Sequence, residues 1–241
     1  MGTLKEFSKE LYMNEITAIF LTCNDLPEEW AKYHKEVLLK SLNGAPLIVM
    51  SQKEMEPWGG NVTHVLQDAP KSFSNIYRQL LRGAKMATTD YIAVVEADTL
   101  YPPEHFLQRP RKGKIGYNMN FWHLFTWDKK PIYSWRNRRG NYSMLSDRLY
   151  VIDALEERFA KWKDGTPDRM TGEIGRPMVE HNLNISVREV EEFETTVAVV
   201  NFQHPFGSDE MQQNERKRAG LVRAYDVPYW GRAEDLVKNF K

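Results

Sequence analysis

The sequence contains little cysteine, no long apolar segment and no net charge. Cys23 is the only cysteine among 241 residues, which excludes an internal disulfide framework and any metal site built from several cysteines. No segment approaches the roughly 20 consecutive apolar residues of a membrane-spanning helix, and the N-terminus lacks an apolar stretch of signal-peptide length. From these absences we expect a cytoplasmic protein without membrane contact.

The charge balance excludes a general attraction to polyanions. Thirty-three basic residues cancel thirty-three acidic ones, so no overall field steers the protein toward nucleic acid or an anionic membrane. Any such preference must be local. With 41% apolar residues and 12% aromatics, the chain can fill a sizeable core.

The first hundred residues alternate between apolar runs and amphipathic stretches. Asp25 and Ser74 are suitable N-caps for the two amphipathic stretches, and Asn43 with Gly44 can end the first of them. Such alternation is typical of βαβ units, in which the sheet is mostly parallel. The pattern predicts strands at 15–25, 45–52 and 91–95, and helices at 26–42 and 74–87.

Two acidic residues, Glu96 and Asp98, follow the third apolar run. Side chains alternate along a strand, so both carboxylates point to the same side if the chain stays extended. Ligands of parallel sheets bind at the carboxyl ends of the strands, where such a pair could share a divalent cation. The alternative is that the two acids begin a solvated turn, with Pro102 and Pro103 ending the strand.

The order of several short motifs resembles the donor half of GT-A glycosyltransferases, particularly family 2. In that family a first strand ends in a Thr-x-Asn turn, and a later helix ends in a small-residue turn. The next strand then enters an acid-x-acid motif that a proline follows. The resemblance covers about residues 15–106, and the matching residues are Thr22-Cys23-Asn24, Ala87 to Tyr91, Glu96-Ala97-Asp98 and Pro102.

This resemblance implies an α/β fold of the GT-A type, with a Rossmann-like, mostly parallel central sheet flanked by helices. Residues 1–106 would form the donor-binding half. Residues 107–241 would form an irregular acceptor-binding half and, from residue 208, a closing segment, all within one continuous domain.

The resemblance also implies a nucleotide-diphosphate sugar as donor, with a UDP-sugar as our expectation. Glu96 and Asp98 would hold Mn²⁺ or Mg²⁺ against the diphosphate, while Thr22, Asn24 and Ser51 would line the nucleoside pocket, unless these three are ordinary turn or cap residues. The family often has Arg-Asn before the glycine matched by Gly83, where this chain has Leu80 and Leu81. Arg78 or Arg82 would then serve the diphosphate.

The second half offers a further metal ligand and a general base. A strand expected at about 195–202 ends at Gln203 and His204, and enzymes of this type often supply a late histidine to the metal. An inverting transferase needs a carboxylate base near the start of a helix after the acceptor loop. Glu173 is our first choice, followed by Asp168 and Glu180. A structural histidine and ordinary helix N-terminal acids are the alternatives.

Residues 108–139 carry most of the local charge. The segment contains nine basic residues and one acidic residue, Asp128, so its net charge is 9 − 1 = +8. Seven aromatic residues lie among them. Such a segment can neutralise phosphates while its rings stack on bases, although core aromatics with a solvated charged rim, or rings that stack on sugars, would give the same composition. The residues chosen as acceptor contacts are Trp135, Arg136, Arg138 and Arg139.

Three functions follow from these features. The first is glycosylation of hydroxymethylated pyrimidines in DNA, as certain phage enzymes of GT-A type perform, which would place the protein in the host cytoplasm. The second is transfer to a saccharide or lipid-linked acceptor. The third is a degenerate fold that binds nucleic acid or nucleotide without turnover, against which the intact Glu96, Asp98 and His204 argue. The sequence predicts no oligomeric state.

Overall fold

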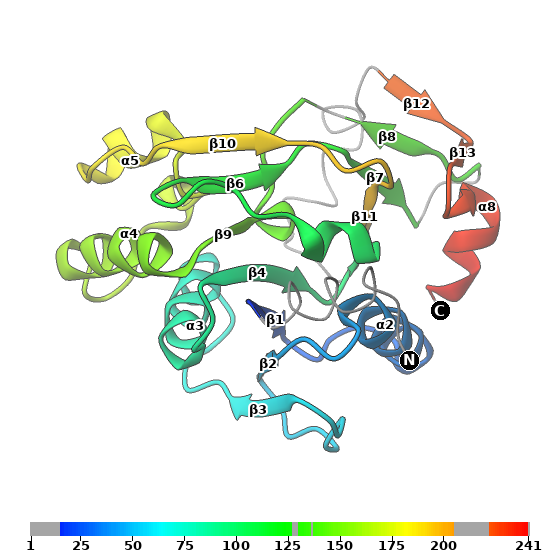
Figure 1. Ribbon diagram of the computed structural model, residues 1–241, viewed down its shortest axis with the longest axis horizontal. Helices are drawn as coiled ribbons and strands as arrows, with labels where there is room; N and C mark the ends of the chain where they lie inside the picture. Colours follow the sequence, from blue (N-terminus) through cyan, green and yellow to red (C-terminus); the bar gives the residue numbers. More distant parts are fainter. Residues whose placement is uncertain (1–14, 127–129, 136, 205–221, 241) are drawn as a thin grey trace, which may run out of the picture.

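The predicted alternation of strands and helices forms the centre of the molecule. The structure, a computed structural model, describes residues 15–126, 130–135, 137–204 and 222–240 (Figure 1). Within them, the first hundred residues form β1 (Ile16–Thr22), α2 (Glu28–Leu42), β2 (Leu47–Ser51), β3 (Val62–Leu66), α3 (Phe73–Met86), β4 (Tyr91–Glu96) and β5 (Thr99–Leu100).

A mostly parallel sheet follows from these elements, as predicted. Its order is β3-β2-β1-β4-β9, where only β9 (Leu145–Asp147) runs antiparallel to its neighbour. Thr22 is in register with Ser51, and Leu21 is in register with Glu96, so β1, β2 and β4 end at one edge of the sheet. The α/β fold class is therefore confirmed, and the carboxyl ends of the strands meet where ligands of parallel sheets bind.

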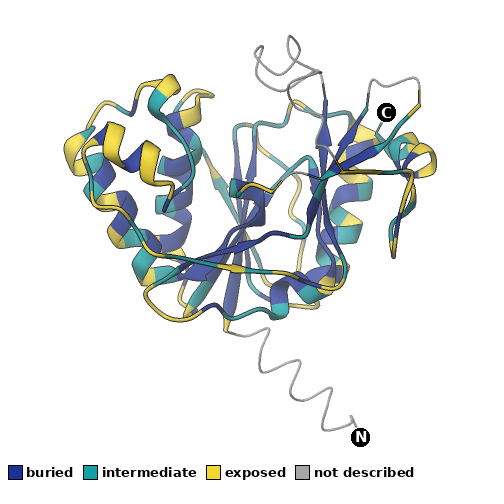
Figure 2. Cartoon of the chain, turned by 90° about the horizontal axis from the view of Figure 1, so that it is seen from above, coloured by how far each residue is buried: buried dark blue, intermediate teal, exposed yellow. Residues whose placement is uncertain are grey.

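Both faces of this sheet are buried, which explains why its strands read as continuous apolar runs. Ile19 and Leu21 pack toward α3 and α4 (Arg148–Lys161), whereas Ala18 and Phe20 pack toward α2 on the other face (Figure 1). Gly83 allows α3 to approach β1, because a Cβ there would lie 2.7 Å from Ile19 Cγ2. Figure 2 shows the result, in which buried strands lie between helices whose outer faces are exposed.

A second sheet lies beside the first, in the order β12-β8-β7-β11-β5. The two predicted halves are interlocked, because β5 of the first half pairs with β11 of the second, and β9 of the second half pairs with β4 of the first. The strands of this sheet are β5, β7 (Phe121–Phe125), β8 (Tyr133–Trp135), β11 (Val199–Gln203) and β12 (Val222–Ala224).

The remaining elements complete the second half. A two-stranded parallel pair joins β6 (Ile115–Asn118) to β10 (Val190–Phe193), and β13 (Asp226–Val227) pairs with β14 (Gly231–Arg232). No helix in the described part of the chain is long and apolar enough to cross a bilayer. The remaining helices are the 3₁₀ turns η1 (Pro103–Leu107), η2 (Asn141–Ser143), η3 (Asp168–Met170) and η4 (Val237–Asn239), and the α-helices α5 (Pro177–Leu183) and α8 (Ala233–Leu236).

Several predicted boundaries are wrong at the ends of elements. Pro27, not Asp25, occupies the N-cap position of α2, and Ser72, not Ser74, caps α3 by accepting a hydrogen bond from Asn75 N. The end of α2 is as predicted, since Asn43 adopts a left-handed conformation with φ 45°.

The strand expected at 195–202 begins at Val199 instead, and the sequence pattern missed β3 and β5. Of the expected closing segment, residues 208–221 lie outside the described part. Residues 222–240 form the short strands β12, β13 and β14, the short helix α8 and the turn η4.

Two buried histidines make stability depend on pH. Burial lowers the pKa of His34 to about 4 and that of His105 to about 3, against about 6.5 in an unfolded chain. Between pH 6.5 and 4 the unfolded chain therefore binds protons that the folded chain does not, and the free energy of unfolding falls as pH falls. Each histidine contributes up to about 1.4 kcal/mol per pH unit.

We therefore expect urea unfolding between pH 7 and 4.5 to show a flatter pH dependence in the double variant His34→Gln, His105→Gln than in the wild type. His181→Gln, at an exposed position, is the control and should retain the wild-type slope. A double variant with an unchanged slope would contradict the assignment of neutral buried imidazoles.

Candidate functional site

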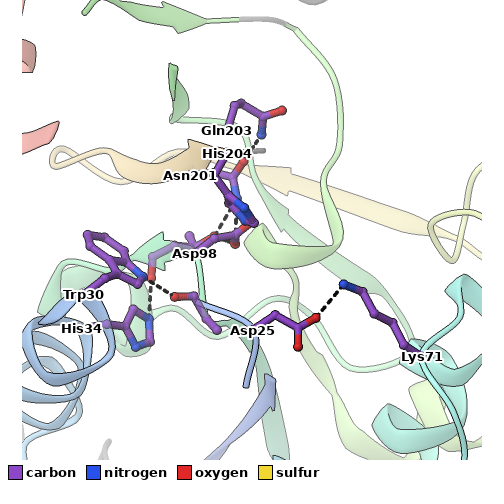
Figure 3. Close-up of polar contacts among 10 residues, drawn as sticks. Asp25, Trp30, His34, Lys71, Asp98, Asn201, Gln203 and His204 are labelled. Atoms are coloured by element: carbon purple, nitrogen blue, oxygen red, sulfur yellow. Dashed lines mark hydrogen bonds and ion pairs between the residues drawn. The ribbon is translucent and has the colours of Figure 1, made fainter. Parts of the chain in front are cut away.

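The turn between β4 and β5 carries Asp98, and its carboxylate lies in a network of side chains. Asp98 Oδ1 accepts hydrogen bonds from Thr99 Oγ1 and Asn201 Nδ2, both at 3.0 Å. Asp98 Oδ2 lies 3.3 Å from His204 Nε2 (Figure 3). Asn201 belongs to β11 and His204 follows it, so the second half of the chain meets the acid motif here. The structure thus brings together Asp98 and His204, which the sequence had proposed as metal ligands.

Helix α2 fixes the backbone of the same turn from the other side. Trp30 Nε1 donates to the carbonyl oxygen of Ala97 at 2.8 Å, and His34 Nε2 lies 2.9 Å from that of Thr99 (Figure 3). Because burial keeps His34 neutral, its Nε2 can donate to this carbonyl. The Asp98 carbonyl points the opposite way and accepts from the backbone N of Phe202 at 2.7 Å. The turn is therefore hydrogen-bonded on both sides.

Glu96, the other acid of the motif, has a different environment. Its Oε1 accepts a hydrogen bond from Asn141 Nδ2 at 3.0 Å. Burial, followed by the negative charge of Asp98, raises the pKa of Glu96 to about 8. The chain also turns at Ala97 and Asp98, so the extended geometry that would align the two side chains does not persist.

A cavity of about 570 Å³ lies at the carboxyl ends of β1 and β4. This volume is within the usual range for small-molecule sites. Glu96, Asp98 and His204 all line it. The other lining residues are Leu21, Thr22, Cys23, Asp25, Leu26, Gln52, Gln67, Lys71, Ser72, Phe73, Asn75, Ile76, Ala97 and Asp168.

The three residues expected in the nucleoside pocket lie at this edge of the sheet in different environments. Thr22 lines the cavity, and its hydroxyl accepts from Asn24 N at 3.0 Å. Asn24, with φ 57°, accepts hydrogen bonds at its side-chain oxygen from the backbone N atoms of Gln52 and Lys53, both at 3.0 Å. Its side chain therefore joins the ends of β1 and β2. Ser51 is buried at the end of β2.

Lys71 is a basic residue of the cavity that the sequence reasoning missed. Its Nζ lies 2.8 Å from Asp25 Oδ2 (Figure 3), and it immediately precedes Ser72, the N-cap of α3. The sequence offered Arg78 or Arg82 for the diphosphate, and neither is among the residues that line the cavity. The Arg78 guanidinium lies 4.6 Å from the centroid of the Phe159 ring and donates to Lys163 O, and Arg82 donates to Leu66 O at 3.0 Å. The one sequence signal that could have pointed to Lys71 is its position directly before the N-terminus of α3.

Of the three predicted general bases, Asp168 is the one that lines the cavity. Its loop is docked on α3, because Thr166 N donates to Ser74 Oγ at 3.0 Å. Glu173 forms ion pairs with Arg176 at 3.3 Å and Arg138 at 3.9 Å.

Glu180 accepts hydrogen bonds from the backbone N atoms of Gly175 and Arg188, at 2.7 and 2.9 Å. These contacts engage both of its oxygens and join the segments before and after α5. Its role as a general base stays a prediction.

The basic segment 108–139 is neutralised locally by acids from other parts of the chain. Six of its nine basic residues form ion pairs in the described part of the protein. Three of the acids, Glu189, Glu191 and Glu192, lie at or beside β10. The pairs are Arg109–Glu15, Arg111–Glu191, Lys112–Asp90, Lys114–Glu189, Arg138–Glu173 and Arg139–Glu192.

Most of the aromatic side chains in this segment are core residues. Tyr117, Phe121, Phe125 and Tyr133 are buried, and Trp135 is half-buried and donates to Met119 O at 3.0 Å. Arg136, one of the predicted acceptor contacts, lies outside the described residues. The arrangement favours the interpretation of core aromatics with a charged rim.

Comparisons with known proteins find distant similarities in structure. No protein-family model matches the chain, and no curated protein does. The bifunctional IspDF from Campylobacter jejuni is 10% identical, with a TM-score of 0.40 over 75% of this chain and 50% of that one. S. aureus TarS is 8% identical, with a TM-score of 0.42 over 78% of this chain and 36% of that one.

A glycosyltransferase involved in the glycosylation of the major capsid of PBCV-1 is 13% identical, with a TM-score of 0.41 over 77% of this chain and 92% of that one. The chain thus spans half of IspDF and about a third of TarS. Similarities of this size assign no activity, substrate or partner to the chain.

Because acidic side chains pair with the basic residues of segment 108–139, we expect these acids to weaken the binding of polyanions to the segment. Replacing Glu189, Glu191 and Glu192 with Gln should free Lys114, Arg111 and Arg139, so that duplex DNA binds more tightly with a steeper salt dependence. The slope of log K against log salt should steepen by up to about 2.7. The matched control replaces Glu28, Glu29 and Glu36, exposed on α2, and changes the net charge equally. Steep salt dependence already present in the wild type would contradict the prediction.

Proposed function

We propose that the protein is a glycosyltransferase that moves a sugar from a nucleotide-diphosphate sugar to a hydroxyl acceptor. The observation that carries this proposal is the Asp98–His204 pair, 3.3 Å apart on the wall of a cavity at the carboxyl ends of parallel strands. The resemblance of the chain to GT-A transferases over residues 15–106 supports the same function.

The chemistry of the cavity suits a nucleoside diphosphate. Phe73, Ile76 and Leu26 offer apolar surface to a base, and Gln52 offers a side-chain amide. Phe73 is 39% exposed although its ring is large and apolar, as expected of a side chain that covers a planar ligand. The Lys71 ammonium supplies positive charge for phosphate oxygens.

Asp98 and His204 are the residues that would hold a divalent cation, Mn²⁺ or Mg²⁺. Among the residues that the structure describes, no three His, Cys, Asp or Glu side chains are grouped around one metal position, and the ligands proposed here are the pair Asp98 and His204. A pair fits cations that take the rest of their ligands from substrate phosphates and water. An ion bound there would neutralise the charge that develops on the departing diphosphate.

Asp168 is the base that the geometry favours. It lines the cavity with Asp98, and the Thr166–Ser74 hydrogen bond holds its loop against α3. In the proposed reaction Asp168 accepts the proton of the acceptor hydroxyl as the sugar bond forms. The locally paired basic segment favours a saccharide over DNA as the acceptor.

Asp98→Asn should abolish release of nucleoside diphosphate from a UDP-sugar in the presence of Mn²⁺ while the fold is retained, because an amide is a much poorer ligand for a hard cation than a carboxylate. The control is Asp90→Asn, an exposed aspartate that pairs with Lys112. Measurements are isothermal titration with UDP and Mn²⁺, mass spectrometry of products from mixed nucleotide sugars, and circular dichroism.

Full turnover by Asp98→Asn, or by the wild type in excess chelator, would contradict the metal-dependent mechanism. UDP binding by the wild type without turnover of any nucleotide sugar would instead favour the non-catalytic binding protein.

A further inference from the structure

The ring of Phe240, near the end of the chain, packs between two side chains of the candidate site. Its centroid lies 4.8 Å from the Trp30 ring and 5.3 Å from the His204 ring, and the planes of Phe240 and His204 are inclined by 27°. Phe202 completes the cluster, with its ring 5.5 Å from Phe240 and inclined by only 13°. The turn η4, which precedes Phe240, contacts α2, which carries Trp30.

Two rings of this cluster, Trp30 and His204, contact the turn that carries Asp98. Trp30 donates to the carbonyl oxygen of Ala97, the residue before Asp98, and His204 lies 3.3 Å from the Asp98 carboxylate. Phe240 thus contacts both the side chain that fixes the turn and the side chain that faces the carboxylate.

We propose that Phe240 is a positioning residue, which sets the plane of the His204 imidazole toward Asp98 by stacking on it. This inference rests on the proposed function, since it concerns the same metal and diphosphate site. A histidine ligand needs a fixed ring orientation, which residues around it normally supply. Without Phe240 the His204 ring loses a face that it packs against and gains rotational freedom about its side-chain torsions.

The fold places Phe240 where this role requires it. Ala233 and Leu236 of α8 are buried in the same apolar cluster as Trp30 and Phe202, and Ala233 N donates to Tyr225 O at 2.9 Å. The turn η4 then leads directly from α8 to Phe240. The C-terminal elements therefore anchor the ring independently of His204.

The first test observes the His204 ring itself and needs no ligand. In ¹H–¹³C spectra of the histidine rings, with His204 assigned through His204→Gln, the stacked Phe240 ring should shift the His204 ring protons upfield. Phe240→Leu keeps apolar bulk and should remove this shift, while Phe240→Tyr keeps a ring and should retain it. A His204 signal that is the same in the wild type and Phe240→Leu would overturn the proposed stacking.

The second test measures binding of Mn²⁺ in the presence of UDP by titration calorimetry. We expect Phe240→Leu to weaken Mn²⁺ binding at least about tenfold, as removal of an orienting partner typically does, and Phe240→Tyr to restore it. Tyr229→Ala, an exposed aromatic of the same C-terminal segment, is the matched control and should bind as the wild type does.

Together, the ring spectra and the Mn²⁺ titration distinguish a wrong role for Phe240 from a wrong proposed function. If the wild type binds Mn²⁺ with UDP and Phe240→Leu binds them equally well, the positioning role is wrong and the proposed function stands. If the wild type binds neither, the proposed function is wrong, and the ring spectra still decide whether Phe240 orients His204.

Discussion

The site depends on how the backbone carbonyl groups find hydrogen-bond donors where the chain leaves the central sheet after β4. Strand β5 is the edge strand of the second sheet, so within the described part of the chain the carbonyl groups on its outer side have no neighbouring strand to pair with. Helix α2 supplies side chains in place of that strand, because Trp30, His34 and Ser41 contact the carbonyl oxygens of residues 97, 99 and 101. The intervening Asp98 carbonyl pairs with β11 instead. This alternation fixes the turn that presents the Asp98 side chain to the cavity.

The same constraint explains how an apolar strand can end in two acids. Asp98 receives two hydrogen-bond donors and faces His204, whereas the raised pKa of Glu96 disfavours its charge. Two ionised carboxylates in this partly buried turn would repel each other, and a neutral Glu96 avoids that repulsion. The two acids of the motif both line the cavity but have different environments, with Asp98 facing His204 and Glu96 hydrogen-bonded to Asn141 from the second half.

Much of the first half could be predicted from local pattern. Apolar runs and helical periodicity gave β1, α2, β2, α3 and β4, because strands buried on both faces leave a strong compositional signal. The short strands β3 and β5 were missed, because the five residues of β3 are all partly or fully exposed and the two residues of β5 are too few to show a period. The helix caps were misplaced by two residues because several residues near each start can serve as caps.

The sequence could not show which residues far apart in the chain contact each other. The pairing of the basic segment 108–139 with Glu189, Glu191 and Glu192 joins residues about fifty to eighty positions apart, and composition alone gave the segment an apparent charge of +8. Asn24 was expected in a ligand pocket because its position matches a family turn, yet its side-chain oxygen binds two backbone amides. Lys71 was missed because its place in the cavity depends on the packing of α3 against β1.

We propose that Asp98 and His204 form the metal- and diphosphate-binding centre of the cavity, and a crystal grown with Mn²⁺ and UDP would show whether an ion binds between them. Anomalous diffraction data above the manganese absorption edge locate the ion independently of the refined coordinates. We expect one strong anomalous peak within bonding distance of the Asp98 carboxylate and His204 Nε2, with oxygens of the diphosphate completing its coordination. A bound UDP whose diphosphate lies away from Asp98, or a cavity that contains no anomalous peak at saturating Mn²⁺, would contradict the account.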